Sequence, residues 1–131
     1  MISRSKIRVR YAETDQMGVV YHSNFLIYFE IGRTDYFREF GFTYLDLEKE
    51  GVFMPVTESF CRYDKSAFYD DVLEVVTNLE MISRLKLKFN YEVFRNGDEK
   101  IAVGYTMHVP VNSEGKPCKI PASYLSAFQK Q

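Results

Sequence analysis

The sequence is poor in cysteine and histidine, and it contains no long run of apolar residues. Its two cysteines, Cys61 and Cys118, form no Cys-x-x-Cys pair, which argues against a disulfide framework and against a zinc ribbon. Its two histidines, His22 and His108, stand alone without clustered ligands, so we expect no metal site. No apolar stretch approaches the roughly 20 residues of a membrane span, and the first residues lack the apolar core of a signal peptide. These absences predict a protein of the reducing cytoplasm.

An excess of charge of one sign is also missing. The chain has 131 residues, with 17 Lys and Arg against 18 Asp and Glu, and the basic residues form no block. This balance argues against a nucleic-acid partner. Neither a Gly-x-Ser-x-Gly elbow nor a glycine-rich phosphate loop is present. The length and the 46% hydrophobic content predict a single globular domain over residues 1–131.

The first third of the chain predicts one strand and one long helix. Residues 6–11 alternate apolar and basic side chains, which predicts a strand that ends near Ala12 and has Tyr11 on its buried face. Aromatic residues then recur at helical spacing, which predicts a helix over residues 23–40 that stops at Gly41. We expect the aromatic stripe of this helix to be core.

The rest of the chain predicts a sheet. A short helical piece at 44–50 is followed by segments rich in β-branched and aromatic residues, and these predict strands at 52–63, 72–83, 85–94 and 100–111. Asn96-Gly97-Asp98 predicts a hairpin turn between the last two strands, and Pro121 opens a final helix over residues 122–130 with Leu125 and Phe128 as its apolar contacts. One helix beside consecutive long strands indicates an α+β fold with an antiparallel sheet wrapped around the helix. Exposed apolar strands would be covered by a second copy, which predicts a homodimer or a homotetramer.

Asp15 and His22 are the most informative residues of the chain. They flank a loop containing Gly18, at the point where the first strand should give way to the long helix. The start of a helix offers unpaired backbone N–H groups that can hold a carbonyl oxygen while a nearby carboxylate acts on it. An isolated Asp before a helix more commonly complements the helix dipole, and an isolated His more commonly has a structural role. Both readings stay open on these residues alone.

The run YAETDQMGVVYHSNF, residues 11–25, resembles the signature of hotdog-fold acyl-CoA thioesterases. The resemblance is to the 4-hydroxybenzoyl-CoA thioesterase group, and especially to its Tol-Pal-associated bacterial branch. Further matches at residues 69–71, 106–109 and 119–121 extend it over nearly the whole chain. It implies a hotdog fold, in which a curved antiparallel sheet wraps one long central helix, and it implies hydrolysis of acyl-CoA to free acid and CoA.

The resemblance also implies roles for the loop residues. Asp15 would be the nucleophile or the general base, and backbone N–H groups near His22 and Ser23 would polarise the thioester carbonyl. His22 would bind the carbonyl or the attacking water, or it would orient Asp15. Some relatives carry an aromatic pair where this chain has Tyr21 and His22, a departure that disfavours a benzoyl substrate and favours short or medium acyl chains.

Several residues would bind substrate in this picture. Tyr21 would line the acyl channel, Gly18 would form the turn, and Asn24 would cap the helix or fix the loop. Arg84 and Lys86 could meet the CoA phosphates, although alternating basic residues on a strand are typical of its solvated face. No cofactor is implied beyond the thioester of CoA or of acyl carrier protein.

Two other functions fit the same pattern. One is a hotdog hydratase or dehydratase of acyl thioesters, in which His22 would be the base. The other is a non-catalytic protein that retains the pocket and binds acyl thioesters. The position of the acid before the helix favours the thioesterase.

Overall fold

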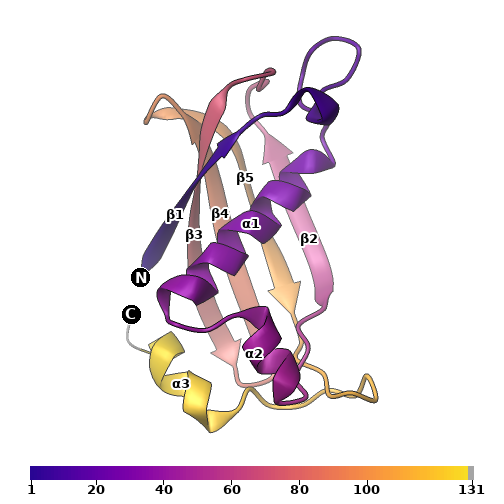
Figure 1. Ribbon diagram of the computed structural model, residues 1–131, viewed down its shortest axis with the longest axis vertical. Helices are drawn as coiled ribbons and strands as arrows, with labels where there is room; N and C mark the ends of the chain where they lie inside the picture. The colour runs from indigo at the N-terminus through magenta and orange to yellow at the C-terminus, as the bar shows by residue number, and fades with distance from the viewer. Residues whose placement is uncertain (130–131) are drawn as a thin grey trace.

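The computed structural model describes residues 1–129, with side chains through residue 125. The chain forms an antiparallel sheet of five strands in the order β1-β3-β4-β5-β2, with helices on one face and at one end (Figure 1). In chain order the elements are β1 (Ile2–Arg8), the 3-10 turn η1 (Tyr11–Glu13), α1 (Asn24–Glu39), α2 (Tyr44–Lys49), β2 (Val56–Tyr63), β3 (Val72–Ser83), β4 (Lys86–Arg95), β5 (Glu99–His108) and α3 (Ala122–Gln129).

Helix α1 lies across the sheet and buries its aromatic stripe against it, which confirms the expected core and the expected α+β hotdog fold (Figure 1). The ring of Phe29 stacks on Tyr91 of β4, with ring centroids 4.3 Å apart and planes 2° from parallel. Gly32 faces β3 so closely that a Cβ atom there would collide with the Thr77 hydroxyl and would lie 3.0 Å from Val75. The absence of a side chain at Gly32 therefore allows α1 to approach β3 closely.

The turns between the strands follow the sequence. Asn96 and Gly97 adopt φ values of 55° and 85° and join β4 to β5, as predicted for this hairpin. Gly41 ends α1 with a φ of 91°. The expected bounds of β3 agree with the structure. The expected apolar contact of Phe128 lies outside the described side chains.

The sequence-based prediction of the first strand was wrong. It covers Ile2–Arg8 instead of residues 6–11, and Tyr11 is 78% exposed instead of buried. The chain turns into η1 after this strand, because the backbone N–H of Arg10 donates to the Glu13 carboxylate over 2.9 Å. Alternation therefore continues past the point where the sheet pairing stops.

The two edges of the sheet differ in chemistry. Strand β1 carries Arg4, Lys6 and Arg8 at one edge, whereas β2 at the other edge exposes Val56, Phe60 and Tyr63. Charged side chains discourage a second strand from pairing with an edge, and apolar ones invite it. Among residues 1–129, no helix is both long and apolar enough to cross a bilayer.

Candidate active site

The loop between η1 and α1 closes on itself as a tight turn. The backbone N–H of Asp15 donates to the Val19 carbonyl over 2.9 Å, and the N–H of Gly18 donates to the Asp15 carbonyl over 3.0 Å. Gly18 has a φ of 76°, in the left-handed region where a residue without Cβ is favoured. The sequence places Gly18 at this turn, and the structure confirms that placement.

The two oxygens of the Asp15 carboxylate have different surroundings. Oδ1 accepts hydrogen bonds from the backbone N–H groups of Met17, at 2.9 Å, and Val19, at 3.2 Å. Within residues 1–129, Oδ2 has no hydrogen-bond partner. One oxygen is thus anchored by the loop while the other is available to a ligand.

The start of α1 leaves two backbone donors unused. The N–H of Tyr21 donates to the Glu13 carbonyl, and those of Asn24 and Phe25 donate to the carbonyls three residues before them. Over the described part of the chain, the N–H groups of His22 and Ser23 have no acceptor. Ser23 occupies the N-cap position but makes no side-chain cap. These two donors lie at the positive end of a helix of 16 residues, where a carbonyl oxygen or an anion is stabilised.

Asp15, Tyr21 and His22 line one cleft, which we call the α1 cleft. Its volume is about 350 Å³, and its walls come from the loop, from the start of α1 and from the connection between β2 and β3. The full lining is Asp15, Val19, Val20, Tyr21, His22, Phe25, Tyr63, Asp64, Lys65, Ser66 and Ala67. The structure therefore brings together the acid, the aromatic residue and the imidazole that the sequence singles out.

His22 is exposed, and its ring packs against two tyrosine rings. Its centroid is 4.5 Å from that of Tyr21 and 6.2 Å from that of Tyr63. The Tyr63 hydroxyl also donates to the backbone carbonyl of His22 over 3.2 Å. The end of strand β2 is thus tied to the residue that carries the imidazole.

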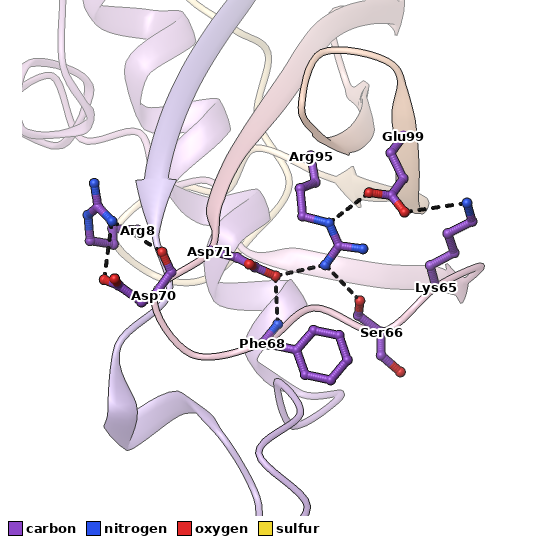
Figure 2. A network of polar contacts seen from close by, with 8 residues as sticks. All are labelled: Arg8, Lys65, Ser66, Phe68, Asp70, Asp71, Arg95 and Glu99. Atoms are coloured by element: carbon purple, nitrogen blue, oxygen red, sulfur yellow. Dashed lines mark hydrogen bonds and ion pairs between the residues drawn. The ribbon is translucent and has the colours of Figure 1, made fainter.

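Arg95, at the end of β4, holds the segment between β2 and β3 that contains Ser66 (Figure 2). Its guanidinium donates to Asp71 over 2.7 Å, to Glu99 over 2.8 Å and to the Ser66 carbonyl over 3.1 Å. These hydrogen bonds keep Arg95 charged and raise its pKa, and they hold the pKa of Glu99 at about 2. Since Ser66 lines the cleft, the network fixes that wall to the hairpin of β4 and β5.

The other residues predicted to bind substrate lie in different parts of the structure. Asn24 does not cap the helix; its side-chain amide donates to the Glu13 carbonyl over 2.8 Å and so fixes the loop. Arg84 and Lys86 lie at the hairpin of β3 and β4, at the end of the sheet opposite the Asp15 loop (Figure 1). The Arg84 guanidinium donates to the Ile120 carbonyl over 2.7 Å. Within this chain, Arg84 and Lys86 do not reach the cleft.

Sequence reasoning missed residues of this region, among them Tyr63, Asp64, Lys65 and Glu13. Tyr63 lines the cleft from the end of β2, and Asp64 and Lys65 line it from the connection that follows; no motif marks any of the three. Glu13 lies inside the signature run, yet its carboxylate faces the Tyr28 hydroxyl at 2.9 Å, away from the cleft. The available signal for Glu13 was an acid placed between the predicted first strand and the aromatic helix. For the other three, only the sheet order could reveal their position.

Comparison with known proteins gives one consistent family. Residues 9–128 match the thioesterase-like superfamily. The chain is 36% identical to YneP of Bacillus subtilis, in an alignment that covers 97% of this chain and 90% of that protein. It is 28% identical to the acyl-CoA thioester hydrolase YbgC of Escherichia coli, in an alignment that covers 97% of this chain and 96% of that protein. Its fold superposes on the DHNA-CoA thioesterase of Staphylococcus aureus with a TM-score of 0.93 and 38% identity, covering 98% of this chain and 89% of the other. The chain therefore belongs to the thioesterase-like superfamily, and its fold is the hotdog fold of these enzymes.

Proposed function

We propose that this protein hydrolyses acyl-CoA thioesters in the α1 cleft, with Asp15 as the reacting carboxylate. The observation that carries the proposal is the pairing of a free Asp15 oxygen with two unused backbone donors at the start of α1. The thioester carbonyl would accept from the N–H groups of His22 and Ser23. Such donors typically contribute about 3–4 kcal/mol to an oxyanion.

Two routes use the same geometry. In the first, Asp15 Oδ2 attacks the thioester carbon, the C–S bond breaks, CoA leaves as the thiolate, and water then hydrolyses the mixed anhydride. In the second, Asp15 takes a proton from water, which attacks the carbon directly and displaces the thiolate. Rapid acid quench with intact-mass measurement separates the routes. Only the first adds the mass of the acyl group to the protein.

His22 would assist either route from the cleft wall. Its ring could bind the carbonyl or the attacking water, or it could orient Asp15. Tyr21, beside it, would line the channel for the acyl group. A contact between Arg84 or Lys86 and the CoA phosphates would have to come from a second copy of the chain.

The proposal is tested by thiol release from a panel of aliphatic and aromatic acyl-CoAs, with Asp15→Asn as the variant. We expect kcat to fall at least about 100-fold while the fold is kept. Asp64→Asn is the matched control, because Asp64 lines the same cleft but pairs with Arg62 over 2.9 Å. Full activity of Asp15→Asn would reject the proposal. Hydration of an enoyl-CoA without thiol release would instead indicate a hydratase, and binding without any reaction would indicate a non-catalytic protein.

The panel must include both kinds of acyl group for a specific reason. The relatives include an enzyme named for an aromatic substrate, the DHNA-CoA thioesterase, and enzymes named only for acyl-CoA. The pair of Tyr21 and His22 leads us to expect the higher kcat/KM with short or medium aliphatic chains. A thioester on acyl carrier protein is an additional substrate to test.

We further propose that the chain acts as one domain, in the cytoplasm, as a homodimer or a dimer of dimers. The free thiols of Cys61 and Cys118 are compatible with a reducing compartment. The apolar edge of β2 is the surface that we expect a second copy to cover, since the β1 edge is basic. Sedimentation of wild type and Phe60→Lys tests this, because a charge on the β2 edge should shift the protein toward monomer.

A further inference from the structure

Glu13 is a buried carboxylate that does not face the reacting groups. Glu13 is 7% exposed, and it lines neither the α1 cleft nor a second hollow formed by residues 11, 12, 14, 15 and 16. A buried carboxylate is unfavourable unless it is well hydrogen-bonded. The role of Glu13 therefore lies in the groups that its carboxylate and its backbone carbonyl bind.

Three donors converge on the Glu13 side chain. Oε1 accepts from the backbone N–H of Arg10 and from the Tyr28 hydroxyl, each over 2.9 Å, and Oε2 accepts from Arg10 Nε over 3.0 Å. Burial alone would raise the pKa of Glu13, but these hydrogen bonds and the Arg10 charge together lower it. The carboxylate thus joins the start of η1 to the second turn of α1.

The backbone carbonyl of the same residue holds the segment that carries His22. It accepts from the backbone N–H of Tyr21 over 2.9 Å and from the side-chain amide of Asn24 over 2.8 Å. These two contacts flank His22 and Ser23 on both sides. The N–H groups between them are the ones that have no acceptor among the described residues.

We infer that Glu13 is a positioning residue for the carbonyl-binding donors, an inference that rests on the proposed thioesterase function. Its carboxylate locks η1 onto α1, and η1 in turn presents the Glu13 carbonyl at the point where Tyr21 and Asn24 can bind it. Without the lock, the carbonyl shifts, and the N–H groups of His22 and Ser23 no longer point to one oxygen. A misplacement of about 1 Å in a site of this kind reduces rates by up to about 100-fold.

Glu13→Gln is the direct test, because an amide keeps the size but must turn an N–H₂ group toward one of the donors. We expect kcat to fall about 10- to 100-fold with KM changed less than about 3-fold, since the donors act mainly in the transition state. Tyr28→Phe removes one donor without altering charge, and we expect a smaller fall of about 3- to 10-fold in kcat. It also serves as the test if Glu13→Gln does not fold. Unchanged kcat in the folded variants would overturn the inference.

A control separates positioning from a general loss of stability. Glu39, the last residue of α1, accepts from the Ser3 hydroxyl over 2.9 Å at the opposite end of the helix. Glu39→Gln removes a carboxylate that joins β1 to α1, as Glu13 joins η1 to α1, and we expect its kcat to stay within about 2-fold of wild type. An equal loss of kcat in Glu39→Gln and Glu13→Gln would contradict a specific role for Glu13.

Binding of two unreactive CoA analogues gives a readout that does not depend on turnover. One is a ketone, which keeps the carbonyl oxygen and replaces sulfur by methylene; the other is a thioether, which lacks the oxygen. We expect Glu13→Gln to weaken the ketone about 3-fold, in keeping with the small change in KM, and to leave the thioether unchanged, because only the ketone uses the donors. Equal weakening of both would overturn the inference. If Asp15→Asn proves fully active, the proposed function fails, but this comparison still reports on Glu13.

Discussion

The Tyr63 hydroxyl donates a hydrogen bond of 3.2 Å to the backbone carbonyl of His22, although the two residues lie 41 positions apart in the chain. The bond joins the last residue of β2 to the segment just before α1. The Tyr63 ring also packs edge-on against Phe25, with centroids 5.4 Å apart. Tyr63 therefore connects the sheet to the candidate carbonyl site.

We predict that Tyr63→Phe lowers kcat/KM for acyl-CoA about 3- to 10-fold, because a neutral hydrogen bond contributes about 0.5–1.5 kcal/mol. The ring stays in place, so the fold should be kept. Tyr105→Phe is the control, since the Tyr105 hydroxyl donates to the Glu58 carboxylate over 2.7 Å and lines no part of the cleft. Steady-state kinetics on both variants decides the matter. Equal rates for wild type and Tyr63→Phe would show that this bond does not support catalysis.

A second prediction concerns the network around Arg95 (Figure 2). The Arg95 side chain is 16% exposed, and Arg95→Met would leave the Ser66 carbonyl without its donor and Asp71 with only the backbone N–H of Phe68. We expect the free energy of unfolding to fall by about 2 kcal/mol, since breaking a partly buried charged network leaves groups unpaired. Urea unfolding followed by circular dichroism measures it.

The same variant should also loosen the wall of the cleft that contains Ser66. We expect faster amide hydrogen exchange at residues 64–68 in Arg95→Met than in wild type. Arg62→Met is the matched control, because Arg62 pairs with Asp64 on an open surface where the pair stabilises little. If Arg95→Met and Arg62→Met unfold at the same urea concentration as wild type, the network has no structural importance.

Tight packing at Gly32 supports a third prediction. Gly32→Ala would press a methyl group against the Thr77 hydroxyl and Val75, which we expect to destabilise the fold by about 1–3 kcal/mol. In the described part of the chain, the buried Thr77 hydroxyl has no hydrogen-bond partner. Thr77→Ala should therefore recover part of the loss in the double variant. Thermal unfolding of both single variants and the double variant tests this, and strictly additive losses would contradict a steric origin.

Local signals were sufficient where neighbouring residues decide the structure. The bounds of β3, the hairpin at Asn96 and the end of α1 at Gly41 follow from alternation and from backbone conformations that few residues adopt. The Asp15 loop was recognised from its signature run. These features depend on contacts within a few residues.

The remaining errors involve contacts between distant segments. The early end of β1 depends on Glu13, whose carboxylate is also held by Tyr28, 15 positions away. Tyr63 enters the cleft because β2 pairs with β5 at the edge of the sheet. Alternation on a strand shows which face Lys86 occupies but does not show which end of the sheet lies near Asp15. Sheet order therefore had to come from the structure.

The last prediction concerns His108, which is fully buried in a chain of directed hydrogen bonds. Its Nδ1 lies 3.3 Å from the Met54 carbonyl, which can only accept, so Nδ1 is the protonated nitrogen. Nε2 then accepts from the Thr106 hydroxyl over 2.7 Å, and Thr106 in turn accepts from the Tyr91 hydroxyl over 2.7 Å. Burial, and secondarily the charge of Arg33, lower the pKa of His108 from 6.5 to about 4.

The sign of the resulting pH dependence follows from these pKa values. The unfolded chain protonates His108 near pH 6.5, whereas the folded protein does so only near pH 4. The neutral imidazole therefore contributes its full stability above about pH 6.5, and this contribution is lost as the pH falls toward 4. A pKa difference of this size corresponds to roughly 3 kcal/mol.

In His108→Gln this part of the acid destabilisation should disappear. The difference in unfolding free energy between wild type and variant should therefore change by about that amount from pH 7 to pH 4. Urea unfolding at several pH values in this range measures the gap, and a constant gap would show that His108 does not titrate differently in the folded protein.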